Sequence, residues 1–76
     1  MPYIHVKMWP KSEDEKKAMA NNLIKAITDA LDCPAQYVTL SMEEIDPQKW
    51  EETVGPELKA REEQVYFIQG EKKKAF

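Results

Sequence analysis

Two segments in which every second residue is apolar flank one long segment with a helical repeat, and this order constrains the fold more than any other feature. The alternating segments are residues 3–8 and 37–43. One face of them carries Ile4, Val6, Met8, Val38, Leu40 and Met42, and the other carries Tyr3, His5, Lys7, Tyr37, Thr39 and Ser41. Alternation of this kind predicts two strands, each with one buried face.

The segment between them has the start and stop signals of one helix. Ser12 is followed three residues later by Glu15, which is the spacing of a capping box, and it predicts a helix that begins at Glu13. We expect one stripe of this helix to face the core, at Met19, Leu23, Ala26, Ile27, Ala30 and Leu31. We expect Lys16, Lys17, Asn21, Lys25 and Asp29 to face water. The helix should end at Asp32-Cys33-Pro34, because proline disfavours helical geometry in the preceding residue.

A strand, a helix and a strand joined by short loops predict a βαβ unit with two parallel strands and a right-handed crossover. The fold class is therefore α+β, in a single domain that covers residues 1–76. One helix cannot cover both faces of a two-stranded sheet, and both strands keep an open edge. We therefore expect a homodimer or a larger homo-oligomer in which a second subunit completes the sheet.

The remaining third of the chain has weaker signals. Asp46-Pro47 predicts a short helical turn through Trp50, and Gly55-Pro56 predicts a second helix start. We expect residues 57–63 to form a short, mostly exposed helix. Residues 65–68 are rich in β-forming side chains and end at Gly70, so they predict a short strand that wraps onto a partner subunit.

Composition narrows the cellular setting and the partners. The formal net charge of −3 argues against nucleic acid as the main partner. The single cysteine, Cys33, allows no intramolecular disulfide and no zinc-ligand spacing. The first strand segment is too short and polar for a signal peptide, and no apolar run reaches membrane-spanning length. We expect a cytoplasmic protein without a membrane partner, and we interpret Lys72, Lys73 and Lys74 as a solvated tail.

Pro2 directly follows Met1, and a small second residue favours removal of the initiator methionine. A proline at a free terminus is a secondary amine that can accept and return a proton, whereas proline nitrogen within a chain cannot. An apolar pocket or a neighbouring cation would keep this amine uncharged and suited to general-base catalysis. The alternative interpretation is a proline that merely precedes the first strand.

The order of several features resembles the 4-oxalocrotonate tautomerase family. These features are Pro2 before a strand, a helix opened by Lys11-Ser12-Glu13-Asp14-Glu15, the strand at residues 37–43, and Trp50. The resemblance covers residues 2 to about 58. Residues 4–11 and 45–50 look most like the dimer-forming bacterial branch of that family.

The resemblance implies a cofactor-free 1,3-proton shift in an α-keto or enol acid, without a metal, in which Pro2 carries the proton as general base and acid. Lys11 stands where the family usually has an arginine and is the candidate cation; an ordinary exposed lysine is the alternative. Trp50 stands where the family has an aromatic pocket residue, and it also suits an anchor of the C-terminal segment. Thr39 replaces a second arginine that contacts substrate, so a monocarboxylate such as phenylpyruvate is favoured over a dicarboxylate.

Two other functions remain open from the sequence. One is hydration or dehalogenation of a small unsaturated acid, which the same proline can support as an acid. The other is a non-catalytic dimeric binding module of the same fold, which is suggested by Lys11 and Thr39 in place of arginines. We assign no catalytic role to His5, because no serine or cysteine nucleophile can be paired with it from sequence, and none to Cys33.

Overall fold

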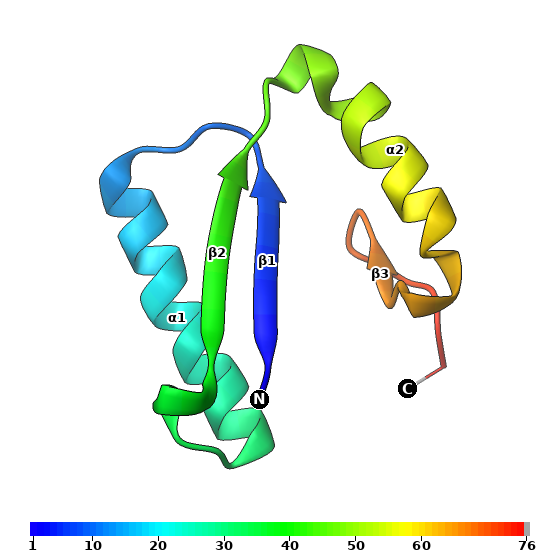
Figure 1. Cartoon of the computed structure of the whole chain (residues 1–76). Coiled ribbons are helices and arrows are strands. Elements are labelled where there is room, and N and C mark those ends of the chain that lie inside the picture. The colour runs from blue at the N-terminus through cyan, green and yellow to red at the C-terminus, as the bar shows by residue number, and fades with distance from the viewer. Residues whose placement is uncertain (76) are drawn as a thin grey trace. The chain divides into compact units, whose positions relative to one another are not determined.

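The structure is a computed structural model that describes residues 1–75. It divides the chain into two compact units, Met1–Asp46 and Pro47–Phe76. The first unit holds the two long strands and the long helix, and the second holds a shorter helix and a small hairpin (Figure 1).

The first unit is the βαβ unit that the sequence predicts. Strand β1 (Tyr3–Met8) leads into helix α1 (Glu13–Leu31), and the chain returns as strand β2 (Thr39–Glu44). The strands run parallel and in register over their whole length, so that Tyr3 is paired with Thr39 and Met8 with Glu44 (Figure 1). The predicted α+β class and the parallel pairing are confirmed, whereas completion of the sheet by a second subunit stays a prediction.

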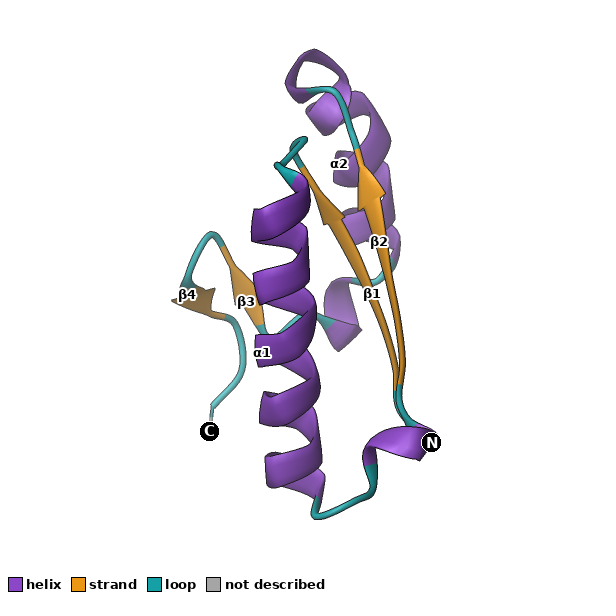
Figure 2. Ribbon diagram, turned by 90° about the vertical axis from the view of Figure 1, so that its left-hand side faces the viewer, coloured by secondary structure: helices purple, strands orange, loops and turns teal. Residues whose placement is uncertain are grey.

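Helix α1 covers one face of the strand pair (Figure 2). The Lys16 ammonium contacts the Glu44 carboxylate, and Glu44 shares its strand face with Leu40 and Met42. The face under α1 is therefore the apolar one. The opposite face, which we call the polar face, carries Tyr3, His5, Lys7, Thr39, Ser41 and Glu43.

The predicted start of α1 is confirmed and its predicted core stripe is partly wrong. The Ser12 hydroxyl accepts a hydrogen bond from the Glu15 backbone N–H, and the capping box is complete. The half-covered side chains of the helix are Lys16, Met19, Ala20, Leu23, Ile24, Ile27 and Thr28. Ala26, Ala30 and Leu31, which we expect in the core stripe, are exposed, Leu31 at 55%, whereas Lys16, which we expect to face water, is half-covered. The apolar pattern gave the right helix but a stripe that is rotated by part of a turn.

The second strand begins two residues later than predicted, because a 3₁₀ turn precedes it. Residues Ala35–Tyr37 form that turn, in which the Tyr37 N–H donates to the Pro34 carbonyl at 3.1 Å. The following ladder bond runs from the Thr39 N–H to the Pro2 carbonyl at 3.1 Å. A local hydrogen bond after a proline therefore outweighs the strand preference of Tyr37.

The second unit contains one helix where two short starts are predicted. A 3₁₀ turn (Pro47–Lys49) leads into helix α2 (Trp50–Ala60), which passes through Pro56 without a break. The proline ring normally clashes with the Cβ of the preceding residue, but that residue is Gly55, which has no Cβ. The Gly-Pro pair that predicts a new helix start is thus tolerated in the helix interior.

A second 3₁₀ turn (Glu62–Gln64) leads to the hairpin of strands β3 (Phe67–Ile68) and β4 (Glu71–Lys72). Gln69 and Gly70 form its loop, and both have positive φ, as a type I′ turn requires. The predicted strand at residues 65–68 is confirmed in its second half. It pairs with β4 of the same chain, and contact with a partner subunit stays a prediction.

Little of the chain is fully buried. Among the described residues, the buried apolar side chains are Met8, Ile45 and Val54. Ile45 follows β2, and its N–H donates to the Met8 carbonyl at 2.8 Å. In residues 1–75, no helix has both the length and the apolar character that crossing a bilayer requires.

Candidate functional site

The structure brings Pro2 and Thr39 together at one end of the sheet. Tyr3, which follows Pro2, is the register partner of Thr39, and the Thr39 N–H donates to the Pro2 carbonyl at 3.1 Å. Pro2 is half-buried, whereas Met1 is 97% exposed. The backbone of Pro2 is therefore held by the sheet, while the residue before it projects from the unit.

Lys11 lies at the other end of the same sheet. It lies in the loop between β1 and α1, and its backbone N–H donates to the Glu44 carboxylate at 3.0 Å. Six residues of β1 separate the two ends, and at roughly 3.3 Å per residue this is about 20 Å. Within one chain, the structure thus separates Lys11 from Pro2 and Thr39.

The Glu44 carboxylate organises the loop that carries Lys11. One oxygen accepts the Lys11 backbone N–H, and the other accepts from the Lys16 ammonium at 2.9 Å. Hydrogen bonds from Lys16 and from the Lys11 backbone lower the pKa of Glu44. Hydrogen bonds to Glu13 and Glu44 raise the pKa of Lys16 to about 12. The loop is therefore fastened to both α1 and β2.

Carboxylates also surround the start of α1, a helix N-terminus at which backbone N–H groups are generally expected to donate to a bound anion. The Glu15 N–H donates to the Ser12 hydroxyl, and the Glu15 carboxylate accepts from the Ser12 N–H. Hydrogen bonds from the Ser12 N–H and the Ser12 hydroxyl lower the pKa of the Glu15 carboxyl, and the Lys11 charge adds a smaller effect. Two of the expected donors are thus occupied within the chain, and Lys11 stands near Glu15 as well as Glu44.

Trp50, the fourth predicted site residue, begins α2 in the second unit. It is half-buried, and the helix that follows it carries Val54, which is fully buried. This partial burial fits the alternative role of Trp50 as an anchor of the C-terminal segment.

Sequence reasoning missed a connected set of side chains on the polar face. His5 Nδ1 lies 2.5 Å from Ser41 Oγ, and His5 Nε2 lies 2.9 Å from a Glu43 carboxylate oxygen. The Tyr3 hydroxyl lies 3.1 Å from Ser41 Oγ. A serine partner for His5 is therefore present, although we could not assign one. The signal was the shared polar face of both strands, but only the register pairs His5 with Ser41.

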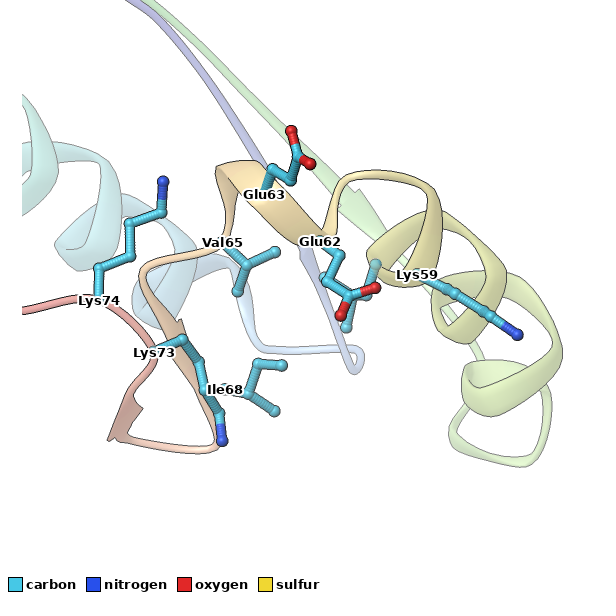
Figure 3. Close-up of a pocket in the computed structure, with 8 residues that line it drawn as sticks. Lys59, Glu62, Glu63, Val65, Ile68, Lys73 and Lys74 are labelled. Atoms are coloured by element: carbon cyan, nitrogen blue, oxygen red, sulfur yellow. The ribbon is translucent and has the colours of Figure 1, made fainter.

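The second unit contains a pocket of about 770 Å³, which we call the C-terminal pocket. Its lining residues are Leu58, Lys59, Glu62, Glu63, Val65, Ile68, Lys73 and Lys74. Figure 3 shows the Lys59 ammonium and the Glu63 carboxylate directed away from the Val65 and Ile68 side chains. The pocket thus has an aliphatic part and a rim of both charge signs, and it includes none of the predicted site residues.

A comparison of the chain with models of known protein families gives no match, and a comparison with curated proteins gives no significant match. In the part of the chain that the structure describes, no three His, Cys, Asp or Glu side chains are grouped so that they could hold a metal ion.

Proposed function

We propose that this protein is a cofactor-independent keto–enol tautomerase that acts on a small α-keto or enol acid, with Pro2 as general base and acid. One observation carries the proposal: the Pro2 carbonyl is held by the Thr39 N–H at 3.1 Å, while Met1 is 97% exposed. Removal of Met1 from this exposed end would leave the proline amine on a backbone that the sheet holds in place. A positioned base is what efficient proton transfer needs.

Besides the base, the reaction requires a hydrogen-bond donor and a positive charge near the substrate. The proton α to a ketone is weakly acidic, so an enzyme places donors or positive charge where the enolate oxygen develops its charge. Thr39 is exposed beside Pro2 and offers one hydroxyl as a donor. A single neutral donor suits a monocarboxylate, and the phenylpyruvate class is the proposed substrate.

Lys11 enters such a site from a second copy of the chain, because about 20 Å of β1 separates it from Pro2 within one chain. Self-association is supported independently by the first unit. Its sheet has only two strands, and α1 has no fully buried side chain. We therefore propose a homodimer or a larger homo-oligomer, in which Trp50 supplies an apolar wall to the site.

The test is ketonisation of phenylenolpyruvate, followed by the loss of enol absorbance. Intact mass first establishes that the purified protein lacks Met1. We expect Pro2→Ala to lower kcat/KM by about 10²-fold or more, because a primary amine on a more flexible backbone replaces the fixed secondary amine. Lys11→Ala should raise KM for the enol acid, because it removes the positive charge. Lys11→Arg keeps that charge, so its KM should stay close to that of the unchanged protein.

Gln48→Ala, an exposed substitution in the second unit, is the matched control. Turnover by Pro2→Ala at the rate of the unchanged protein would contradict the proposal, and so would a mature protein that keeps Met1. Release of halide from a 3-haloacrylate, without ketonisation, would instead support the hydratase or dehalogenase alternative.

A binding module of the same fold is the second candidate, and the surroundings of Lys11 favour it. The backbone of Lys11 is bonded to Glu44, and the capping box occupies nearby donors. These carboxylates weaken the field that Lys11 offers to an anion. Saturable binding of phenylpyruvate without turnover would support this candidate over the enzyme.

A further inference from the structure

The side chains of the polar face form a hydrogen-bond chain with a definite direction. An ionised Glu43 only accepts, so His5 Nε2 must donate to it across 2.9 Å. In the neutral imidazole, Nδ1 then lacks a proton and accepts from the Ser41 hydroxyl at 2.5 Å. Ser41 Oγ in turn accepts from the Tyr3 hydroxyl at 3.1 Å. Every link runs from Tyr3 through Ser41 and His5 to Glu43.

We propose that Ser41 is a nucleophile for acyl transfer, with His5 as its general base and Glu43 as the residue that fixes the imidazole tautomer. A nucleophile, a base within hydrogen-bond reach and a third group that orients the base are the parts that such chemistry requires. All three are present, and they come from two adjacent strands in register. The site is separate from the proposed role of the Pro2 amine.

The reaction can be written with Ser41 Oγ attacking the carbonyl carbon of an ester. The Oγ–C bond forms while the hydroxyl proton moves to His5 Nδ1. The ester C–O bond then breaks, and the leaving alcohol takes that proton. Water attacks the acyl-serine in the second step, gives its proton to Nδ1, and releases the acid as Ser41 regains its proton.

Tyr3 adds a donor for the tetrahedral intermediate. Its hydroxyl lies 3.1 Å from Ser41 Oγ, and once Oγ bonds to carbon this O–H can turn to the adjacent oxyanion. The Tyr3 ring is 65% exposed and lies 6.3 Å from the His5 ring, centroid to centroid. An open aromatic surface beside the nucleophile favours aryl esters of small acids as the substrate class.

The base is partly solvated, which limits the expected rate. The His5 and Glu43 side chains are 34% and 49% exposed, so the hydrogen bonds operate in a medium closer to water than to a buried site. General-base assistance contributes about 10²- to 10⁴-fold in enzymes, and we expect the lower end here.

The test uses the full chain with diisopropyl fluorophosphate and, separately, with p-nitrophenyl acetate. The chain contains two serines, Ser12 and Ser41. Labelling of Ser12 therefore serves as an internal control for labelling of Ser41 in the unchanged protein and in every variant that keeps both. The Ser12 hydroxyl contacts Glu15 and has no histidine beside it. Peptide mass mapping should find the phosphoryl group on Ser41, at a rate about 10²-fold above that of Ser12.

Release of p-nitrophenolate measures turnover. Ser41→Ala and His5→Gln should each lower the rate by about 10²-fold, and Glu43→Gln should lower it less. Ser12→Ala should leave both labelling and turnover unchanged. Because an imidazole alone can cleave this ester, a Ser41→Ala protein with the full rate would overturn the proposal.

Circular dichroism keeps the variants interpretable. Ser41→Ala removes one hydroxyl from a half-exposed position and should leave the spectrum unchanged. Ser41→Thr retains a hydroxyl, so it should recover part of the labelling. Two results would overturn the proposal: equal labelling of Ser12 and Ser41 in the unchanged protein, or labelling of Ser41 that persists in His5→Gln. Either would show that the hydrogen bonds between Tyr3, Ser41, His5 and Glu43 have a structural role only.

Discussion

The two units of the chain are built from contacts of very different range. In Met1–Asp46, the strands that form the sheet are far apart in sequence, and His5 meets Ser41 across 36 positions. In Pro47–Phe76, the helix, the 3₁₀ turn and the hairpin follow one another, and β3 pairs with β4 through a two-residue loop. Chemistry that combines residues from distant segments is therefore concentrated in the first unit.

This difference also separates the two kinds of site. Pro2 with Thr39, and His5 with Ser41, are pairs that only the parallel register creates. The C-terminal pocket, in contrast, is lined by residues from a single short stretch between Leu58 and Lys74. Substitutions that disturb the long-range ladder should accordingly have larger effects than those that disturb local structure.

The largest effect should come from the core of the first unit. Met8 is 8% exposed at the end of β1, and its carbonyl accepts the Ile45 N–H. Met8→Ala should lower the free energy of unfolding by about 3 kcal/mol, because it leaves a cavity at the end of the ladder. Urea unfolding monitored by circular dichroism measures this loss. Met19→Ala, half-exposed on α1, is the control and should cost clearly less; equal losses would contradict the contrast.

A smaller loss is expected from the core of the second unit. Val54 is 6% exposed within α2. Val54→Ala removes two buried side-chain carbons, and each contributes about 0.8 kcal/mol to the free energy of unfolding. The better helix propensity of alanine offsets about 0.5 kcal/mol of this loss. Thermal unfolding should therefore show a net loss of about 1 kcal/mol. Thr53→Ala, at the exposed neighbouring position, should show no loss, and a larger cost there would contradict the burial argument.

The hairpin turn should give a comparable but local effect. Gly70 has φ of +80°, and a Cβ placed there would meet no atom within 4 Å. The cost of Gly70→Ala is therefore one of backbone conformation alone, about 1 kcal/mol. Hydrogen exchange of the Lys73 N–H, which donates to the Tyr66 carbonyl at 2.7 Å, reports it directly. Gly55→Ala is the control at the other glycine: its Cβ would meet the Pro56 ring, so it should destabilise α2 and leave the exchange of the Lys73 N–H unchanged.

The smallest effect should be a pH dependence in the first unit. Hydrogen bonds from Lys16 and the Lys11 backbone lower the pKa of Glu44 from its ordinary 4.5. A carboxyl with a lowered folded-state pKa contributes stability above its unfolded pKa, and this contribution is lost as the pH falls through the folded value. The difference in Tm between the unchanged protein and Glu44→Gln should thus be present at pH 7 and shrink below pH 4.5.

At high pH, deprotonation of Lys16 removes the stability that the Lys16–Glu44 ion pair contributes. Its pKa is raised to about 12, so its contribution is present below 10.5 and is lost as the pH rises through 12. Glu63→Gln, an exposed change in the second unit, is the control. A difference in Tm for Glu44→Gln that grows on acidification would contradict the assignment.

The sequence predicted the first unit better than the second, and the reason lies in the strength of the patterns. Residues 3–8 and the capping box at Ser12 gave boundaries that the structure confirms. The start of β2 was missed because the Tyr37 N–H bonds back to Pro34. At Gly55-Pro56 the predicted second helix start was wrong: α2 continues through the pair, and a glycine before proline has no Cβ to clash with the proline ring.

Of the candidate site, the sequence supplied Pro2, Lys11, Thr39 and Trp50 as residue types in a recognisable order. It could not place them, because the length of β1 decides that Pro2 and Lys11 stand at opposite ends of the sheet. It also offered His5 without a partner. Ser41 lies on a strand whose register no local pattern encodes.

The sequence by itself determined the two long strands, their apolar face and the start of the long helix, because alternation and capping depend on residues within a few positions of one another. Only the tertiary structure decided which side chains meet. The pairing of Tyr3 with Thr39 and of His5 with Ser41 follows from the register of two parallel strands. That register depends on the packing of α1 against one whole face of the sheet, which no single segment specifies.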